Sequence, residues 1–135
     1  MPVITERAQI RERDRKDRWD RIALEASKQC GRTKPTIIEN TLSFDNAIKD
    51  YSEKGLTVIL HVNCEVSVKN RIKNSLQAPQ NIILFVGPEG GFTDNEVLLG
   101  NKMGFMSLGL GPRVLRTETA SIAVLSVLQF HYGDL

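Results

Sequence analysis

The sequence has few of the features that mark secreted, membrane-embedded or metal-binding proteins. Its two cysteines, Cys30 and Cys64, lack a Cys or His partner at the spacing of a metal site, so we expect free, buried thiols and no metal. Polar residues or glycine interrupt every apolar stretch before it reaches membrane-spanning length, and no signal-peptide pattern begins the chain. These absences favour a cytoplasmic protein with no membrane partner.

The rest of the composition is typical of one globular domain, with 135 residues, 41% of them hydrophobic and 25% charged. The net charge of +2 conceals an asymmetry, because residues 6–34 carry ten basic and six acidic side chains. One interpretation is a contact surface for a polyanion such as a nucleic acid. The other is a solvated helix face, stabilised by the acid-first i,i+4 pairs Glu12–Lys16, Asp14–Arg18 and Asp17–Arg21.

Hydrophobic periodicity predicts an α/β domain with a mainly parallel sheet and helices on both faces. The expected helices cover residues 14–30, 43–51, 68–76, 94–102 and 118–131, and the expected strands cover residues 36–38, 56–62, 82–86 and 105–108. The first helix has one apolar stripe, formed by Trp19, Ile22, Ala23, Ala26 and Cys30. The last helix is apolar nearly all round, which requires cover from the sheet and its neighbours or from a second subunit; we favour a homodimer.

Two glycine-containing loops indicate the site. The strand at 82–86 ends in Gly87-Pro88-Glu89-Gly90-Gly91, and a helix follows in which Thr93 and Glu96 have the spacing of a capping box. A second loop, Leu108-Gly-Leu-Gly-Pro-Arg-Val-Leu-Arg-Thr-Glu-Thr119, follows the next strand. Strands that end in such loops commonly bind anionic or nucleotide-like ligands, so we expect both loops to form one site.

Familiar nucleotide and hydrolase motifs do not fit these loops. Neither loop ends in the Gly-Lys-Ser/Thr of a Walker A motif, and Gly109-Leu-Gly111 lacks the third glycine of a Rossmann fingerprint. No Gly-x-Ser-x-Gly elbow is present. His61 ends a strand at the edge where the loops should lie, so it either lines the site or has a structural role. His131 is better explained as a cap of the last helix.

The two loop sequences carry a specific resemblance. Gly87-Pro-Glu-Gly-Gly-Phe-Thr-Asp-Asn-Glu96 and Leu110-Gly-Pro-Arg-Val-Leu-Arg-Thr-Glu-Thr-Ala120 resemble the two signature segments of the RsmE family, SPOUT-class methyltransferases of small-subunit ribosomal RNA. The segment Arg18-Trp-Asp-Arg-Ile-Ala-Leu-Glu-Ala-Ser-Lys-Gln-Cys-Gly31 is similar to the first helix of the family's catalytic domain. The resemblance therefore covers nearly the whole chain.

Membership of this family would imply more than the periodicity can. It implies a C-terminal trefoil knot, a homodimer with the site at the subunit interface, and S-adenosylmethionine held mainly by backbone groups. The positions that match the cofactor loops are Leu60, His61, Val86, Gly87, Pro88, Glu89, Gly90, Gly91, Leu108, Gly109, Leu110, Gly111, Val114 and Leu115.

The resemblance also implies a reaction, the methylation of uridine N3 in 16S ribosomal RNA. Removal of the N3 proton leaves negative charge on the flanking carbonyl oxygens, which a guanidinium can stabilise. Arg116 is our candidate for this role and for RNA contact, and Arg113 is the alternative or a phosphate contact. Glu118 would orient Arg116 or help with the proton; the alternative is that Arg116 and Glu118 form only a structural salt bridge.

The chain departs from the family pattern in one respect. Members usually carry an N-terminal, β-rich, PUA-like RNA-binding domain, and residues 1–135 are expected to form a single SPOUT domain without it. A knotted module that binds RNA or cofactor without catalysis is therefore an alternative function. A flavodoxin-like nucleotide binder is a third, weaker one.

Overall fold

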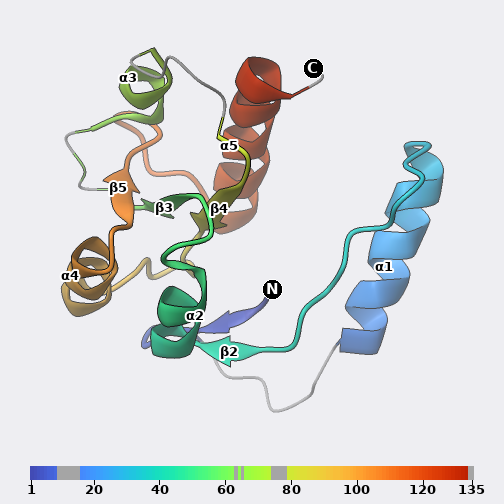
Figure 1. The fold of residues 1–135 in the computed structure, drawn as a ribbon, viewed down its shortest axis with the longest axis horizontal. Helices are drawn as coiled ribbons and strands as arrows, with labels where there is room; N and C mark the ends of the chain where they lie inside the picture. The colour runs from blue at the N-terminus through green and yellow to red at the C-terminus, as the bar shows by residue number, and fades with distance from the viewer. Residues whose placement is uncertain (9–15, 63, 65, 74–78, 134–135) are drawn as a thin grey trace.

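The computed structural model describes residues 1–8, 16–62, 64, 66–73 and 79–133 (Figure 1). The elements are β1 (Val3–Ile4), α1 (Lys16–Gln29), β2 (Leu42–Ser43), α2 (Phe44–Tyr51), β3 (Leu56–Leu60), α3 (Val68–Lys73), β4 (Ile82–Phe85), α4 (Asp94–Lys102), β5 (Met106–Leu108) and α5 (Thr117–Tyr132). The predicted helices and the last three predicted strands are confirmed, with ends that differ by a few residues where both ends are described.

The main sheet is parallel, as predicted, and has the order β4-β3-β5. In this register Val58 of β3 lies opposite Leu84 of β4 on one side and Met106 of β5 on the other. A separate two-stranded sheet pairs β1 with β2, also in parallel. Because the strands of the main sheet run in one direction, the loops that follow β3, β4 and β5 start from the same edge.

Helices cover both faces of the main sheet. On one face Ile59 and Phe85 pack with residues of α2 and the α4 region, in a cluster that also contains Phe44, Ala47, Ile48, Phe92 and Phe105. On the other face Val58 and Leu108 pack with Val68 of α3 and Val124 of α5. The neighbours Val58 and Ile59 thus serve opposite layers, because successive side chains of a strand alternate between faces.

Two predicted helix starts are confirmed by their caps. Ser43 Oγ accepts a hydrogen bond from the N–H of Asn46 at the start of α2. Thr93 and Glu96 form the expected capping box at the start of α4: Thr93 Oγ1 accepts from Glu96 N at 3.3 Å, and Thr93 N donates to Glu96 Oε2 at 2.8 Å. This box fixes where the chain turns from the first glycine loop into a helix.

The predicted strand at residues 36–38 is wrong. These residues form no strand, and Ile37 is 78% exposed. The strand in this part of the chain is β2, and its partner β1 was not predicted. β-branched residues favour a strand mainly through packing against neighbours, and residues 36–38 have no partner strand.

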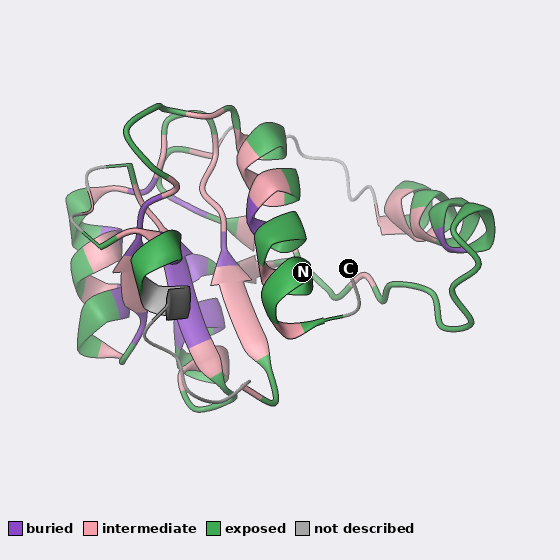
Figure 2. Ribbon diagram, turned by 90° about the horizontal axis from the view of Figure 1, so that it is seen from above, coloured by how far each residue is buried: buried purple, intermediate pink, exposed green. Residues whose placement is uncertain are grey.

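The expected burial of the Cys30 thiol is also wrong, and the apolar stripe of α1 is largely exposed. In α1 only Ser27 is buried, Ile22 is 53% exposed, and Cys30 is a free but exposed thiol. The reason is visible in Figures 1 and 2, where α1 stands apart from the body of the domain and its surface is mostly exposed. Among the described residues, neither hydrophobic core cluster includes a residue of this apolar stripe.

The surface ion pairs of α1 differ from those predicted. Lys16 Nζ lies 2.8 Å from Asp20 Oδ2, and Lys28 pairs with Glu25. No ion pair joins Asp17 to Arg21 among the described side chains. The pairs Glu12–Lys16 and Asp14–Arg18 involve residues outside the described part of the chain. A solvated, charged face on α1 fits these contacts.

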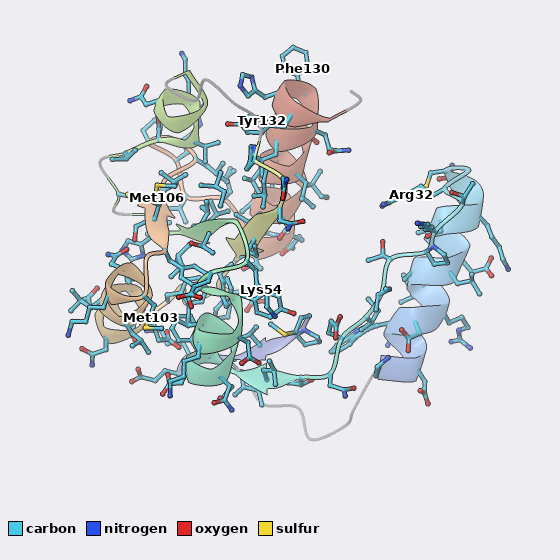
Figure 3. All side chains as sticks on the ribbon, viewed as in Figure 1. Arg32, Lys54, Met103, Met106, Phe130 and Tyr132 are labelled. Carbon is cyan, nitrogen blue, oxygen red and sulfur yellow. The ribbon has the colours of Figure 1, made fainter. Side chains whose placement is uncertain are left out.

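The last helix is covered on one side only. Val124 of α5 is buried against the sheet, but Ile122, Leu125, Val127 and Phe130 are exposed. Figure 3 shows Phe130 near the end of α5, with its ring directed away from the domain. Within the described residues, no helix is both long and apolar enough to cross a membrane.

Candidate functional site

A cavity of about 490 Å³ lies where β3, β4 and β5 end. Its walls come from the loops that follow these strands, from the start of α5 and from the turn after β1. The lining residues are Arg7, Leu60, His61, Val62, Val86, Gly87, Pro88, Glu89, Gly90, Gly91, Phe92, Asp94, Leu108, Leu110, Gly111, Arg113, Val114, Leu115, Arg116, Thr117 and Ala120. The parallel sheet thus brings both glycine loops to one site, as the sequence predicted.

The first loop, residues 87–91, is a tight turn that needs glycine. Gly91 has φ +69°, and its N–H donates to the carbonyl of Pro88 at 2.8 Å. At Gly87 a Cβ would lie only 3.2 Å from the backbone nitrogen and the ring of Phe92, so a side chain would crowd the turn. The backbone can therefore approach a ligand without side-chain obstruction.

Two carbonyls of this loop accept hydrogen bonds from side chains in distant parts of the chain. Thr117 Oγ1 donates to Gly87 O at 3.0 Å, and Arg7 Nη1 donates to Gly90 O at 2.8 Å. Among the described residues, the N–H groups of Glu89 and Gly90 have no protein acceptor. The loop consequently keeps free donors beside the cavity while its position is fixed from both sides.

The second loop starts from a buried anchor. Gly109 N donates to Val66 O, and Gly109 O accepts from Val68 N, both at 2.9 Å. A Cβ at Gly109 would touch the carbonyl of Cys64 at 3.4 Å. The strand end is held further by Cys64, whose thiol donates to Ser107 O. Gly109 therefore lies behind the wall, and Leu110 and Gly111 line the cavity instead.

The charged side chains of this loop are unequally placed. Arg113 and Arg116 are exposed and line the cavity, whereas Glu118 is exposed and lies outside its lining. In the described part of the chain, neither guanidinium has an ionic or hydrogen-bonding partner, so the alternative of a salt bridge between Arg116 and Glu118 is not observed. Arg116 is also the N-cap residue of α5, and its carbonyl accepts from Ala120 N at 2.8 Å.

The structure gathers the predicted positions around the cavity, except Gly109 and Glu118. His61 is half-buried and lines it, and its N–H donates to Leu108 O at 3.0 Å. Sequence reasoning missed Arg7, Val62, Phe92, Asp94, Thr117 and Ala120. Phe92, Asp94, Thr117 and Ala120 lie within the two quoted motifs, and Val62 directly follows His61, so the neighbouring sequence could have suggested all five. Arg7 had no such signal.

The described residues hold no group of three or more His, Cys, Asp or Glu side chains that could bind a metal ion. The donors around the cavity are instead backbone N–H groups and guanidinium groups. Together with the apolar walls from Val86, Leu108, Leu110 and Leu115, they form a slot for an organic ligand with both apolar and polar parts.

Comparisons with known proteins agree with this geometry. Residues 1–129 match the family model described as an RNA methyltransferase domain. The ribosomal RNA small subunit methyltransferase E of Mesomycoplasma hyopneumoniae is 37% identical over 81% of this chain and 46% of its own length. The enzyme of that name from Aquifex aeolicus is 33% identical over 95% of this chain and 55% of its own length.

Solved structures give the same result. A putative methyltransferase from Legionella pneumophila, in complex with the cofactor SAM, aligns with a TM-score of 0.88 and 38% identity over 99% of this chain and 55% of that protein. A ribosomal RNA small subunit methyltransferase E from Neisseria gonorrhoeae, bound to S-adenosyl methionine, aligns with a TM-score of 0.84 and 31% identity over 96% of this chain and 53% of that protein. The chain spans about half the length of the curated relatives it matches, and it belongs to the RsmE family of RNA methyltransferases.

Proposed function

We propose that the cavity binds S-adenosylmethionine and that the chain carries the methyl-transfer site of a small-subunit ribosomal RNA methyltransferase. The observation that carries this proposal is the meeting of the two glycine loops around one cavity, with free backbone donors on the first loop. The solved relatives bound to SAM support the same cofactor here.

The residues present fit this cofactor. A volume of about 490 Å³ lies within the range of small-molecule sites. The apolar side chains of Val86, Leu108 and Leu110 can pack against a flat purine, and the N–H groups of Glu89 and Gly90 can donate to its polar atoms. The cofactor, when bound, supplies an electrophilic methyl group attached to a sulfonium.

The side chains that face the cavity also suit the proposed substrate, uridine in 16S ribosomal RNA. Its N3 carries a proton at neutral pH, and loss of that proton leaves negative charge on the two neighbouring carbonyl oxygens. The guanidinium of Arg116, which has no partner among the described residues, can stabilise this charge. Arg113 lies three residues earlier and likewise has no partner in the described part of the chain, so it can contact a phosphate of the RNA.

We further propose that the chain forms a trefoil knot and a homodimer. The segment after β3 is tied to the end of β5, since Ser67 and Gly109 form a parallel bridge, and the chain then continues into α5, whose first residue bonds to Gly87 beside β4. Such a path is compatible with threading through a loop. The exposed apolar side chains of α5 suit a subunit interface next to the cavity. An enzyme of ribosomal RNA would act in the cytoplasm, where ribosomes assemble.

The proposal is tested by incubating the chain with unmodified small ribosomal subunits and cofactor labelled in its methyl group. We expect label in the 16S RNA, recovered as N3-methyluridine after digestion. A full-length relative assayed in parallel shows that the substrate is competent. RNA that stays unlabelled beside an active relative would favour the non-catalytic module instead, provided that the chain still binds the cofactor.

A further inference from the structure

We propose that Arg7 is a positioning residue that sets the geometry of the cofactor loop from the opposite end of the chain. This inference rests on the proposed function, because the loop matters only if it holds the cofactor. In the sequence Arg7 is one of ten basic residues of an N-terminal segment, which offers only a solvated face or an RNA contact. The structure gives Arg7 a different environment.

Arg7 contacts the first glycine loop in two ways. Its Nη1 donates to Gly90 O at 2.8 Å across a separation of 83 residues. Its aliphatic part lies against Gly90, because a Cβ built at Gly90 would sit 3.4 Å from both Cβ and Cδ of Arg7. A guanidinium bonded to a carbonyl, with its stem packed on the same residue, holds that peptide in one orientation.

The backbone of Arg7 is itself fixed to the structure. Ala8 N donates to Thr5 O at 3.1 Å, which closes a turn after β1, and Thr5 is 7% exposed. Glu6, which lies in this turn, makes two hydrogen bonds to the start of α4. Its N–H donates to Glu96 Oε1 at 2.9 Å, and its Oε2 accepts from Thr93 Oγ1 at 3.0 Å.

These contacts explain why the arginine acts as a brace and not as a mobile surface group. Glu6 ties the turn to the capping box of α4, directly after the loop, and Arg7 reaches back to the loop itself. The carbonyl of Gly90 points at Arg7, so the loop cannot rotate this peptide without losing a hydrogen bond to a charged donor. The adjoining N–H groups of Glu89 and Gly90 are thereby kept beside the cavity.

The test compares Arg7→Ala and Arg7→Lys with Arg32→Ala, an exposed arginine after α1 that Figure 3 shows far from the sheet. Titration calorimetry measures cofactor affinity, and near-UV circular dichroism checks that each variant is folded. We expect the affinity of Arg7→Ala to fall about tenfold, the scale of one hydrogen bond to a charged group. Arg7→Lys should recover part of this loss, because an ammonium can also donate to Gly90 O, and Arg32→Ala should match the parent.

Amide hydrogen exchange without cofactor gives a second, independent measurement. Residues 87–92 should exchange faster in Arg7→Ala than in the parent, whereas β3 should exchange at the same rate. Equal cofactor affinity and equal loop exchange in Arg7→Ala and the parent would overturn the brace. A parent chain that binds no cofactor would refute the proposed function, but the exchange comparison would still decide whether Arg7 fixes the loop. Loss of RNA association alone would show that Arg7 is an RNA contact, contrary to this inference.

Discussion

Thr117 Oγ1 donates a hydrogen bond to the carbonyl of Gly87 at 3.0 Å. The first residue of α5 is thereby joined to the first residue of the glycine loop 87–91, although the two are 30 residues apart in sequence. The two motifs that carry the family resemblance are thus in direct contact. Because the bond involves a backbone carbonyl, only the hydroxyl of residue 117 is needed for it.

Replacing Thr117 with Val should therefore weaken cofactor binding while the shape of the side chain is kept. Loss of a neutral hydrogen bond of this kind costs about 1 kcal/mol, which corresponds to about fivefold in affinity if it is expressed entirely in binding. Calorimetric titration of the Val variant measures the change. Thr117→Ser keeps the hydroxyl and should bind as the parent does; an equal loss in both variants would mean that the methyl group matters and the hydrogen bond does not.

Gly100 is a buried glycine inside α4. A glycine inside a helix lowers its intrinsic stability, yet a Cβ at Gly100 would overlap Ile59 Cδ1 on β3. The glycine therefore permits the close approach of α4 to the sheet. We expect Gly100→Ala to lower the free energy of unfolding by about 1–3 kcal/mol, despite the better helix propensity of alanine.

A double mutant can isolate this contact. Ile59→Val removes the Cδ1 atom and by itself should cost about 1 kcal/mol. In urea denaturation the pair Gly100→Ala with Ile59→Val should be more stable than the sum of the single effects predicts, because alanine then occupies the freed volume. Strict additivity would show that the glycine is required for another reason.

Three matched variants distinguish the proposed role of Arg116 from those of Arg113 and Glu118. If it stabilises charge on the uridine carbonyls, Arg116→Ala should reduce the rate of methyl transfer about 100-fold, as removal of a charge-stabilising donor commonly does. Arg113→Ala should act mainly through RNA affinity and lose its effect at saturating RNA. Glu118→Gln should change the rate little, because Glu118 lies outside the cavity lining. Normal methylation by Arg116→Ala would remove Arg116 from the mechanism.

The exposed apolar side chains of α5 predict that the chain forms a dimer in solution. Phe130 is 78% exposed on this helix, and Ile37 is 78% exposed in the segment between α1 and β2. Sedimentation equilibrium should show that Phe130→Glu shifts a dimer toward monomer, while Ile37→Glu, at the same exposure, leaves it unchanged. A parent chain that is monomeric at every concentration tested would contradict the interface.

Local patterns in the sequence were sufficient for much of this fold. The β-branched run of β3 and the capping box of Thr93 and Glu96 depend on neighbouring residues, and both are present as predicted. The pairing of β1 with β2 was missed because a two-residue strand has no periodicity and its partner is about 40 residues away. The exposure of α1 was missed because an apolar stripe does not reveal whether a partner surface exists in the same chain.

In the candidate site, too, features that depend on neighbouring residues were predicted and a contact between distant residues was not. The two loops were predicted from their own glycines, and the parallel sheet brings them together. Gly109 and Glu118 were included because they lie within the motifs, but adjacent residues of a loop can face opposite directions. Arg7 could not be found at all, since its contact with Gly90 spans 83 residues and leaves no trace in local sequence.

The most direct test of the account is a calorimetric titration of the chain with S-adenosylmethionine, alongside Gly91→Val. Gly91 has φ +69°, which a β-branched residue adopts only at a high cost, so the variant should distort the loop. We predict saturable binding of one cofactor per chain to the parent and at least tenfold weaker binding to the variant, roughly the effect of 1.4 kcal/mol. A folded parent chain that releases no heat and shows no saturation would contradict the central claim.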